Sequence, residues 1–208
     1  MKRRNFIATT VAATLTGGSL ISEANEFKSI DKPRSITNKT SGKTLKPLYV
    51  PADNSPTFRR ATKIRFDQTN NQFSCVERIV PPKTMGPAPH VHNDLDEIMR
   101  VLKGTVAVLV GKEVTYVEEG AWHLRPHGIV HTFWNESSEP AHVLEFYPNQ
   151  NFDVFLEEFN KLMAEFKSNG VSPTSKDAIR RIDELEGEWG VISYHDQREP
   201  LMKKYGLI

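Results

Sequence analysis

The sequence predicts an all-β barrel followed by a C-terminal helical extension. Three observations lead to this prediction. About eight short runs of alternating apolar and polar residues lie between positions 63 and 147, turn-forming Pro, Gly, Asn and Asp residues separate them, and no helix-length periodicity occurs in 48–148. Short strands at this spacing are typical of an antiparallel barrel or sandwich. The 208 residues suffice for one domain with a full core and are too few for two large domains.

The expected strands are short and are joined by compact turns. Lys103-Gly104 and Gly111-Lys112 are expected in two of the tightest turns, because glycine adopts the backbone conformations that such turns require. The strands are expected at 63–66, 72–80, 97–102, 105–110, 113–117, 121–124, 130–134 and 141–147.

The pattern changes after Pro148. Large apolar residues recur at three- and four-residue steps from 152 to 166, which predicts an amphipathic helix that ends near Asn169-Gly170. A second helix is expected to start at 172, 173 or 174 and to reach about 186. The following tail is rich in apolar and aromatic residues, so we expect it to pack on the rest of the protein.

The N-terminus resembles an export signal. Arg3-Arg4 precede Asn5-Phe6-Ile7, which is similar to the twin-arginine signal, and small residues at Ser22 and Ala24 suit a cleavage site. We therefore expect a signal peptide at 1–24, a flexible leader at 25–46, a barrel domain at 47–148 and the helical extension at 149–208. The expected location is periplasmic or secreted, in a bacterium.

Composition narrows the possible partners. The formal net charge is +1, so no global electrostatic argument favours nucleic acid. The weakly apolar stretch 6–20 is broken by Thr and Gly, so we expect no stable membrane anchor. Cys75 is the only cysteine, which excludes an intramolecular disulfide, and its place in an alternating run predicts a small buried side chain.

Two blocks of residues combine three histidines with one glutamate. In the first block, His90 and His92 are two residues apart, so on a strand their rings project from the same face, and Glu97 follows after a polar turn. In the second block, a Pro-x-Gly turn at 126–128 leads into a strand that carries His131. Three imidazoles and one carboxylate suit a single divalent transition metal, namely Fe, Mn, Ni, Co, Cu or Zn. On such an ion they leave one or two positions open for substrate or O₂.

These blocks resemble the two motifs of the cupin superfamily. The first is similar to G-x5-H-x-H-x(3,4)-E-x6-G, with Gly104 at its end, and departs from it only because Gly86 lies closer to His90 than the pattern asks. The second, from Gly120 to Asn135, matches G-x5-P-x-G-x2-H-x3-N throughout. The resemblance implies a single cupin jelly-roll, or β-barrel. Over about 57–167 the chain also looks like the single-domain, quercetin dioxygenase-like group.

This resemblance implies metal-dependent chemistry. His90, His92, Glu97 and His131 would hold the metal, and Glu97 would also act toward a substrate hydroxyl as hydrogen-bond acceptor or base. The favoured function is a dioxygenase-like oxidoreductase that acts on a small aromatic or enol-bearing compound with O₂. The alternatives are a non-redox isomerase, lyase or decarboxylase on a sugar acid or carboxylate, and a binding protein without turnover. A homodimer is also expected from the family.

Residues that share a strand face with the ligands are candidates for the substrate pocket. Met99 and Val101 follow Glu97 at two-residue steps, and Phe133 follows His131. Phe73 and Tyr147 are further candidates. Ordinary barrel packing explains these apolar positions equally well. The glutamates at 157, 158, 184, 186 and 188 are expected on solvated helix faces.

Overall fold

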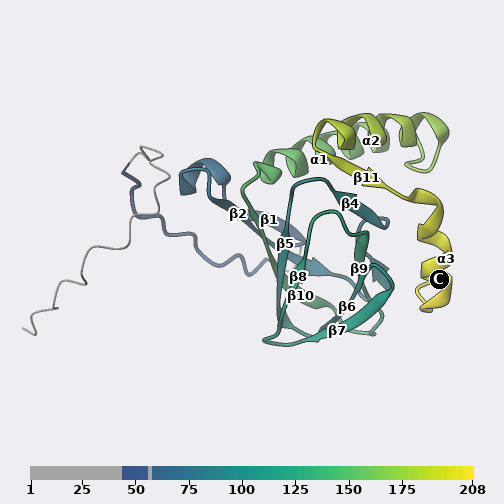
Figure 1. Ribbon diagram of the computed structural model, residues 1–208, viewed down its shortest axis with the longest axis horizontal. Coiled ribbons are helices and arrows are strands. Elements are labelled where there is room, and N and C mark those ends of the chain that lie inside the picture. The colour runs from purple at the N-terminus through teal and green to yellow at the C-terminus, as the bar shows by residue number, and fades with distance from the viewer. Residues whose placement is uncertain (1–43, 56–57) are drawn as a thin grey trace, which may run out of the picture. The chain divides into compact units, whose positions relative to one another are not determined.

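The computed structural model describes residues 44–55 and 58–208, which form two antiparallel β-sheets and a C-terminal extension (Figure 1). The expected signal peptide at 1–24 and nearly all of the expected leader lie outside the described residues. One sheet has five strands in the order β1-β2-β10-β5-β8, and the other follows the order β11-β4-β9-β6-β7, with β3 also paired to β9. This is the all-β, cupin-type barrel with helical extension that the sequence predicts.

The strands are short and most alternate inward and outward side chains. Their bounds are β1 Arg60–Ile64, β2 Phe73–Val80, β3 Thr84–Met85, β4 His90–His92, β5 Glu97–Lys103, β6 Thr105–Val110, β7 Glu113–Glu118, β8 Trp122–Arg125, β9 His131–Asn135, β10 Ala141–Pro148 and β11 Val191–Ser193. The first strand lies slightly earlier than expected, because Phe66 begins a 3-10 turn, η1 (Phe66–Thr69), that ends at the left-handed Asn70.

The barrel core lies between the two sheets. Val101, Val106, Val108 and Val143 are fully buried there, together with the ring of Phe133. Each buried valine removes a branched apolar side chain from water, which contributes about 1.5–3 kcal/mol. Cys75 is buried as expected, and burial raises the pKa of its thiol to about 11. The core therefore supplies a rigid frame for the polar side chains at one end of the barrel.

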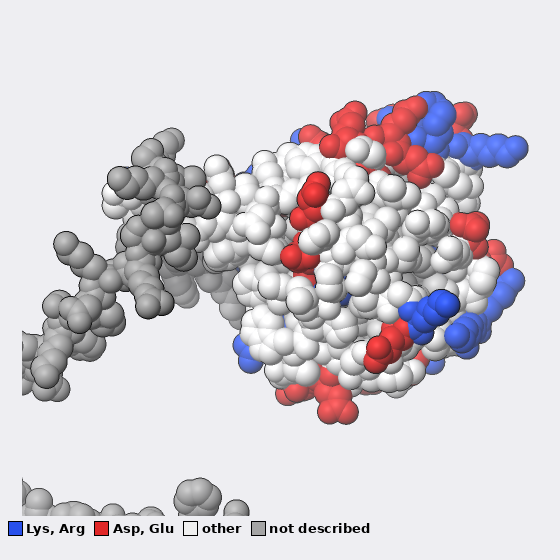
Figure 2. Space-filling view, viewed as in Figure 1, with Lys and Arg blue, Asp and Glu red and all other residues white. Residues whose placement is uncertain are grey.

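Two helices follow the barrel and lie side by side (Figure 1). Helix α1 (Phe152–Ser168) directs Phe152, Phe155 and Leu156 onto the barrel, where they pack with Tyr147. Helix α2 (Lys176–Glu188) starts later than expected, because the Ser175 hydroxyl caps it by accepting a hydrogen bond from the backbone N–H of Ala178 at 3.3 Å. Charged side chains of both signs gather over these helices (Figure 2).

The tail returns to the barrel. Strand β11 pairs with β4, so that Val191 lies opposite His92 and Ser193 opposite His90. A short turn, η2 (His195–Gln197), then leads into α3 (Arg198–Lys204), and the Arg198 guanidinium donates a hydrogen bond of 2.7 Å to the carbonyl oxygen of Gly86. The expectation that the tail packs on the protein is confirmed. In the described part of the chain, no helix combines the length and apolar character needed to span a bilayer.

Gly86 lies directly against the ring of Phe133. A Cβ added at Gly86 would lie 2.7 Å from Cζ of Phe133, closer than real side chains approach. The ring cannot move away easily, because Arg78 and Arg125 each place a guanidinium carbon 5.4 Å from its centroid. Gly86→Ala is therefore expected to lower the free energy of unfolding by about 1–3 kcal/mol through overpacking.

Chemical denaturation at equilibrium measures this loss. Gly187→Ala is the matched control, because it lies in α2 and has no heavy atom within 4 Å of the added methyl group. Alanine favours a helix over glycine by about 0.5–1 kcal/mol, so this variant is expected to be as stable as the unchanged protein or more so. Equal stabilities for the two variants would contradict the packing argument.

Candidate metal centre

Three strands bring four side chains to one point inside the barrel. Strand β4 carries His90 and His92, β5 begins with Glu97, and β9 begins with His131, which lies opposite His90 in the sheet. All four residues are buried. One ligand atom from each lies within 4.8 Å of the others. The spacing of two between His90 and His92 places both rings on the inner face, as the sequence predicts.

The distances describe a compact cluster. Nε2 of His131 lies 3.1 Å from Oε2 of Glu97, and Nε2 of His92 lies 3.4 Å from Oε1 of the same carboxylate. The ring centroids of His90 and His131 are 4.4 Å apart, and those of His90 and His92 are 4.9 Å apart. A single ion placed among these atoms would contact all four side chains.

Backbone carbonyl groups orient two of the imidazoles. Nδ1 of His90 lies 2.9 Å from the carbonyl oxygen of Ala88, and Nδ1 of His131 lies 2.9 Å from that of Ile129. A carbonyl oxygen only accepts hydrogen bonds, so each Nδ1 carries a proton, and in the neutral ring Nε2 then keeps a free lone pair. This second-layer hydrogen bond is the usual way in which proteins orient metal-binding histidines.

The chemistry of the donor set fits a cation. With Nδ1 protonated, Nε2 of a neutral His131 ring is an acceptor that faces the acceptor oxygens of Glu97, and this contact is repulsive unless a positive charge lies between them. Neither ring nitrogen of His92 has a hydrogen-bond partner among the described residues, although both are buried. Burial, together with the imidazole of His131, lowers the pKa of His90 to about 3, which keeps that ring neutral and able to bind a metal.

A buried ion-pair network lies behind Glu97. Nη2 of Arg125 lies 3.2 Å from Oε2 of Glu97 and 2.8 Å from Oε1 of Glu145, and Nε of Arg78 lies 2.7 Å from Oε2 of Glu145. The hydroxyl of Tyr147 donates to Oε2 of Glu145 at 3.1 Å. Arg125, Glu145 and Tyr147 are at most 1 % exposed. The network therefore holds the Glu97 carboxylate in place from inside the protein.

The charges of this network set the protonation of its members. Burial by itself would raise the pKa of Glu97, but the guanidinium of Arg125 has the largest opposing effect, and the pKa lies well below its usual value. Burial and the Glu145 carboxylate raise the pKa of Tyr147 well above its usual value, so its hydroxyl stays protonated. Glu97 is thus ionised at neutral pH, which is the form that binds a metal.

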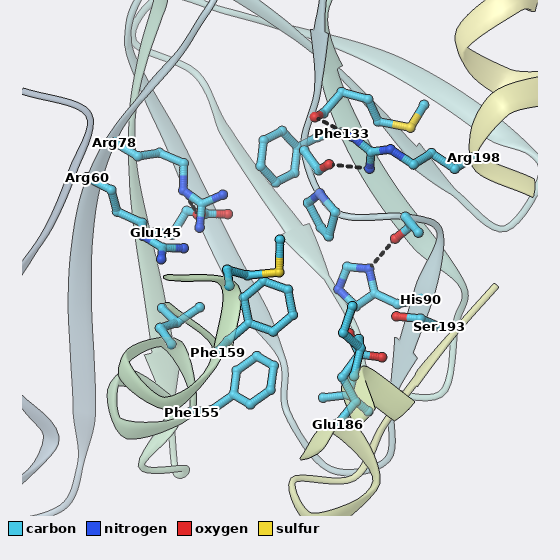
Figure 3. A pocket seen from close by; sticks show the side chains of 18 of the residues that line it. Arg60, Arg78, His90, Phe133, Glu145, Phe155, Phe159, Glu186, Ser193 and Arg198 are labelled. Atoms are coloured by element: carbon cyan, nitrogen blue, oxygen red, sulfur yellow. Dashed lines mark hydrogen bonds and ion pairs between the residues drawn. The ribbon is translucent and has the colours of Figure 1, made fainter. Parts of the chain in front are cut away.

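A cavity of about 520 Å³ opens beside the cluster. His90, His92 and Glu97 line part of it, and α1 contributes an apolar wall that includes Phe155 and Phe159 (Figure 3). Cavities of about 300–1,000 Å³ are typical of small-molecule sites. Three residues of the cluster therefore face a space in which a small organic molecule fits.

The structure places the predicted pocket residues in different positions. Phe133 and Tyr147 line the cavity. Met99 and Val101 share the inner face with Glu97, but they pack in the barrel core and are not among the lining residues. Phe73 also lies away from the cavity, and its ring packs against Phe146 with centroids 6.1 Å apart. Met99 and Val101 share the strand face of Glu97, but the opposite sheet covers that face beyond Glu97.

Sequence reasoning missed the charged residues of the site. Arg78 lies between the apolar residues Val76 and Val80 on β2, and Glu145 lies between Val143 and Tyr147 on β10. A charged residue in an inward-facing position of an alternating strand needs a buried partner. A charged residue at an inward-facing position of an alternating strand is therefore the sequence feature that could have predicted this network.

One of the glutamates expected on a solvated face is buried. Glu186 is 7 % exposed, because β11 and the tail pack over this side of α2, and burial raises the pKa of its carboxyl group. It lies near Asp183 and His195, and Nε2 of His195 is 3.0 Å from Oδ1 of Asp183. The expectation for Glu186 was therefore wrong.

Part of the chain matches a known protein family. Residues 76–147 match the family model described as "Cupin domain", a range that includes all four cluster residues. No curated protein matches the chain.

Several solved structures are similar to parts of the chain. TT1209 from Thermus thermophilus is 28% identical, with 47% of this chain and 89% of that chain covered and a TM-score of 0.38. A sugar phosphate isomerase of the cupin superfamily from Silicibacter pomeroyi is 21% identical, with 44% and 60% covered and a TM-score of 0.39. KdgF from Halomonas sp. is 20% identical, with 48% and 86% covered and a TM-score of 0.39.

Proposed function

We propose that this chain is a metal-dependent enzyme of the cupin type that acts on a small organic molecule, with an oxygenase reaction as the first candidate. One observation supports it above all others. Three imidazoles and one ionised carboxylate converge in a buried cluster that opens onto a cavity of about 520 Å³. A divalent transition metal bound there would offer open coordination positions to a substrate and to O₂.

In this proposal, different residues of the chain have different roles. His90, His92, Glu97 and His131 would hold the metal, and the Ala88 and Ile129 carbonyls keep two of the rings oriented. Arg125 lowers the pKa of Glu97, so this carboxylate is a weak base. We therefore assign to Glu97 the role of a ligand that accepts a hydrogen bond from a substrate hydroxyl. Phe152, Phe155 and Phe159 would exclude water and hold an aromatic or enol-bearing body.

A non-redox enzyme is the second candidate function, and a specific observation favours it. Arg60 and Arg78 also line the cavity, and guanidinium groups bind carboxylates. An isomerase, lyase or decarboxylase that acts on an acid would use such groups to orient its substrate.

Metal analysis followed by activity assays tests the proposal. Purified protein is expected to contain about one transition-metal ion per chain. An oxygenase would consume O₂ with a flavonol-like or enediol compound and would stop under nitrogen, whereas a non-redox enzyme would convert a sugar acid or carboxylate equally well without O₂. Metal-free protein that turns over either class at the same rate would refute both candidates.

We also propose export by the twin-arginine route, on the sequence of residues 1–24 alone. Because this route carries folded proteins, the cytoplasm would determine which metal enters the site. Metal analysis of protein produced with and without residues 1–24 tests this, and identical metal content would contradict it. The expected homodimer stays a prediction, which the mass of the protein in solution would check.

A further inference from the structure

We propose that Arg60 and Arg78 form a carboxylate-binding subsite, so that the cavity takes a small organic acid with an apolar body. The inference deepens the proposed function and rests on it for the chemistry at the other end of the molecule. In Figure 3 the guanidinium groups of Arg60 and Arg78 point into the cavity from one side, and His90 lies on the other. A ligand that reaches both would present its acid group to the arginines and its reactive group to Glu97 and the histidines.

The two arginines retain unused hydrogen-bond donors. Arg78 uses Nε to face Glu145, and no hydrogen bond from either of its Nη groups occurs among the described residues. Nη2 of Arg60 donates to the side-chain oxygen of Asn160, and Arg60 has no carboxylate partner within the described part of the chain. Arg60 is partly buried, and burial lowers its pKa. The Arg60 guanidinium is withdrawn from water without a carboxylate partner among the described residues, which is costly, and the Nη groups of Arg78 remain available although its Nε faces Glu145. Together these donors favour an incoming oxyanion.

The charge balance around the cavity favours a negatively charged ligand. Three guanidinium groups (Arg60, Arg78 and Arg125) face two carboxylates (Glu97 and Glu145), which leaves one positive charge in excess before any metal binds. Arg198 and Glu186 also line the cavity, and their formal charges cancel. A carboxylate offers one negative charge and a planar pair of oxygens that match the guanidinium fork.

The wall between the two ends is apolar. Phe155, Leu156, Phe159 and Met163 of α1 line the cavity together with the arginines. The Phe152 and Phe155 rings stack with centroids 4.6 Å apart, and the Phe152 ring lies 5.1 Å from that of His92. Such a surface favours an aromatic or aliphatic body over a strongly hydroxylated one.

Three probes of similar size test this subsite: phenylacetate, phenyl phosphate and the neutral 2-phenylethanol. Their binding is measured by ligand-observed NMR with chelator-treated protein, so that a metal cannot hold the anion. Phenylacetate is expected to bind about tenfold more tightly than the alcohol, and Arg60→Gln is expected to abolish this preference. Arg60→Lys is expected to retain part of it. Arg59→Gln is the matched control, because Arg59 is adjacent on the chain, exposed and outside the cavity.

Each outcome decides the proposal. Equal affinity for phenylacetate and the alcohol, or the same loss in Arg60→Gln and Arg59→Gln, would overturn the subsite. Tighter binding of phenyl phosphate than of phenylacetate would overturn the assignment to carboxylates. Absence of metal or of turnover would refute the proposed function but would leave a carboxylate preference that depends on Arg60 intact, so the two failures are distinguishable.

Discussion

Replacement of His131 by alanine is expected to lower the affinity for a divalent transition metal by about 100-fold or more. Loss of an outer hydrogen-bond partner of a metal ligand already costs about 10–100-fold, and loss of the ligand itself removes a direct bond. His131 is fully buried, lies 3.1 Å from Glu97 and has its ring oriented by the carbonyl of Ile129. Among the described residues, the group that could hold an ion here consists of His90, His92, Glu97 and His131, so the variant keeps three of four ligands.

Titration of the metal-free protein with Zn(II) or Mn(II), together with elemental analysis, measures this effect. His127→Ala is the matched control, since His127 lies four residues earlier, has an exposed side chain and contacts Asp96 at the surface. Circular dichroism and the unfolding transition show whether His131→Ala still folds. A folded His131→Ala protein that binds as much metal as the control would disprove the metal centre.

Replacement of Arg125 by methionine is expected to lower the free energy of unfolding by about 3–5 kcal/mol. Arg125 is completely buried and lies within ion-pair distance of Glu97 and Glu145. Its removal leaves two buried carboxylates short of a positive partner, and an unpaired buried charge is far more costly than a missing contact at the surface. The uncharged methionine fills much of the space, so the effect reports mainly on charge.

Urea denaturation of metal-free protein, followed by fluorescence, gives this value. Arg180→Met is the control, because Arg180 forms an exposed ion pair with Glu184 on α2, and such pairs contribute about 0–1 kcal/mol. Arg125→Met is also expected to let the pKa of Glu97 rise, since Arg125 is the largest influence that lowers it. Equal midpoints for the two variants would show that the buried network contributes little to stability.

Most of the four-residue cluster was predictable from the sequence because its geometry is largely local. A spacing of two on a strand places His90 and His92 on one face, and a short turn returns the chain at Glu97. His131 lies much farther along the chain, so its place in the cluster was predicted from the second motif and not from local spacing. The alternating runs likewise predicted most strands, since a period of two is the main signal of a half-buried strand.

The missed features depend on contacts between distant segments. Arg125 meets Glu97 because β8 pairs with β5, and Glu145 meets Arg78 because β10 lies beside β2. Neither pairing can be read from a single run of residues. Strand β11 has only three residues, too few for a periodic pattern, and the burial of Glu186 follows from the packing of that strand.

The pairing of β11 with β4 has a consequence for the order of folding. His90 and His92 lie on a three-residue strand, and one of its two neighbours comes from a segment near the end of the chain, beyond the barrel and two helices. A contact between such distant segments forms late, because a long loop must close first. We therefore expect the strand that carries the two histidines to complete its backbone hydrogen bonds only after the tail docks. We therefore expect amide hydrogen exchange in β4 to follow local unfolding of the tail, and the hairpin of β6 and β7 to stay protected.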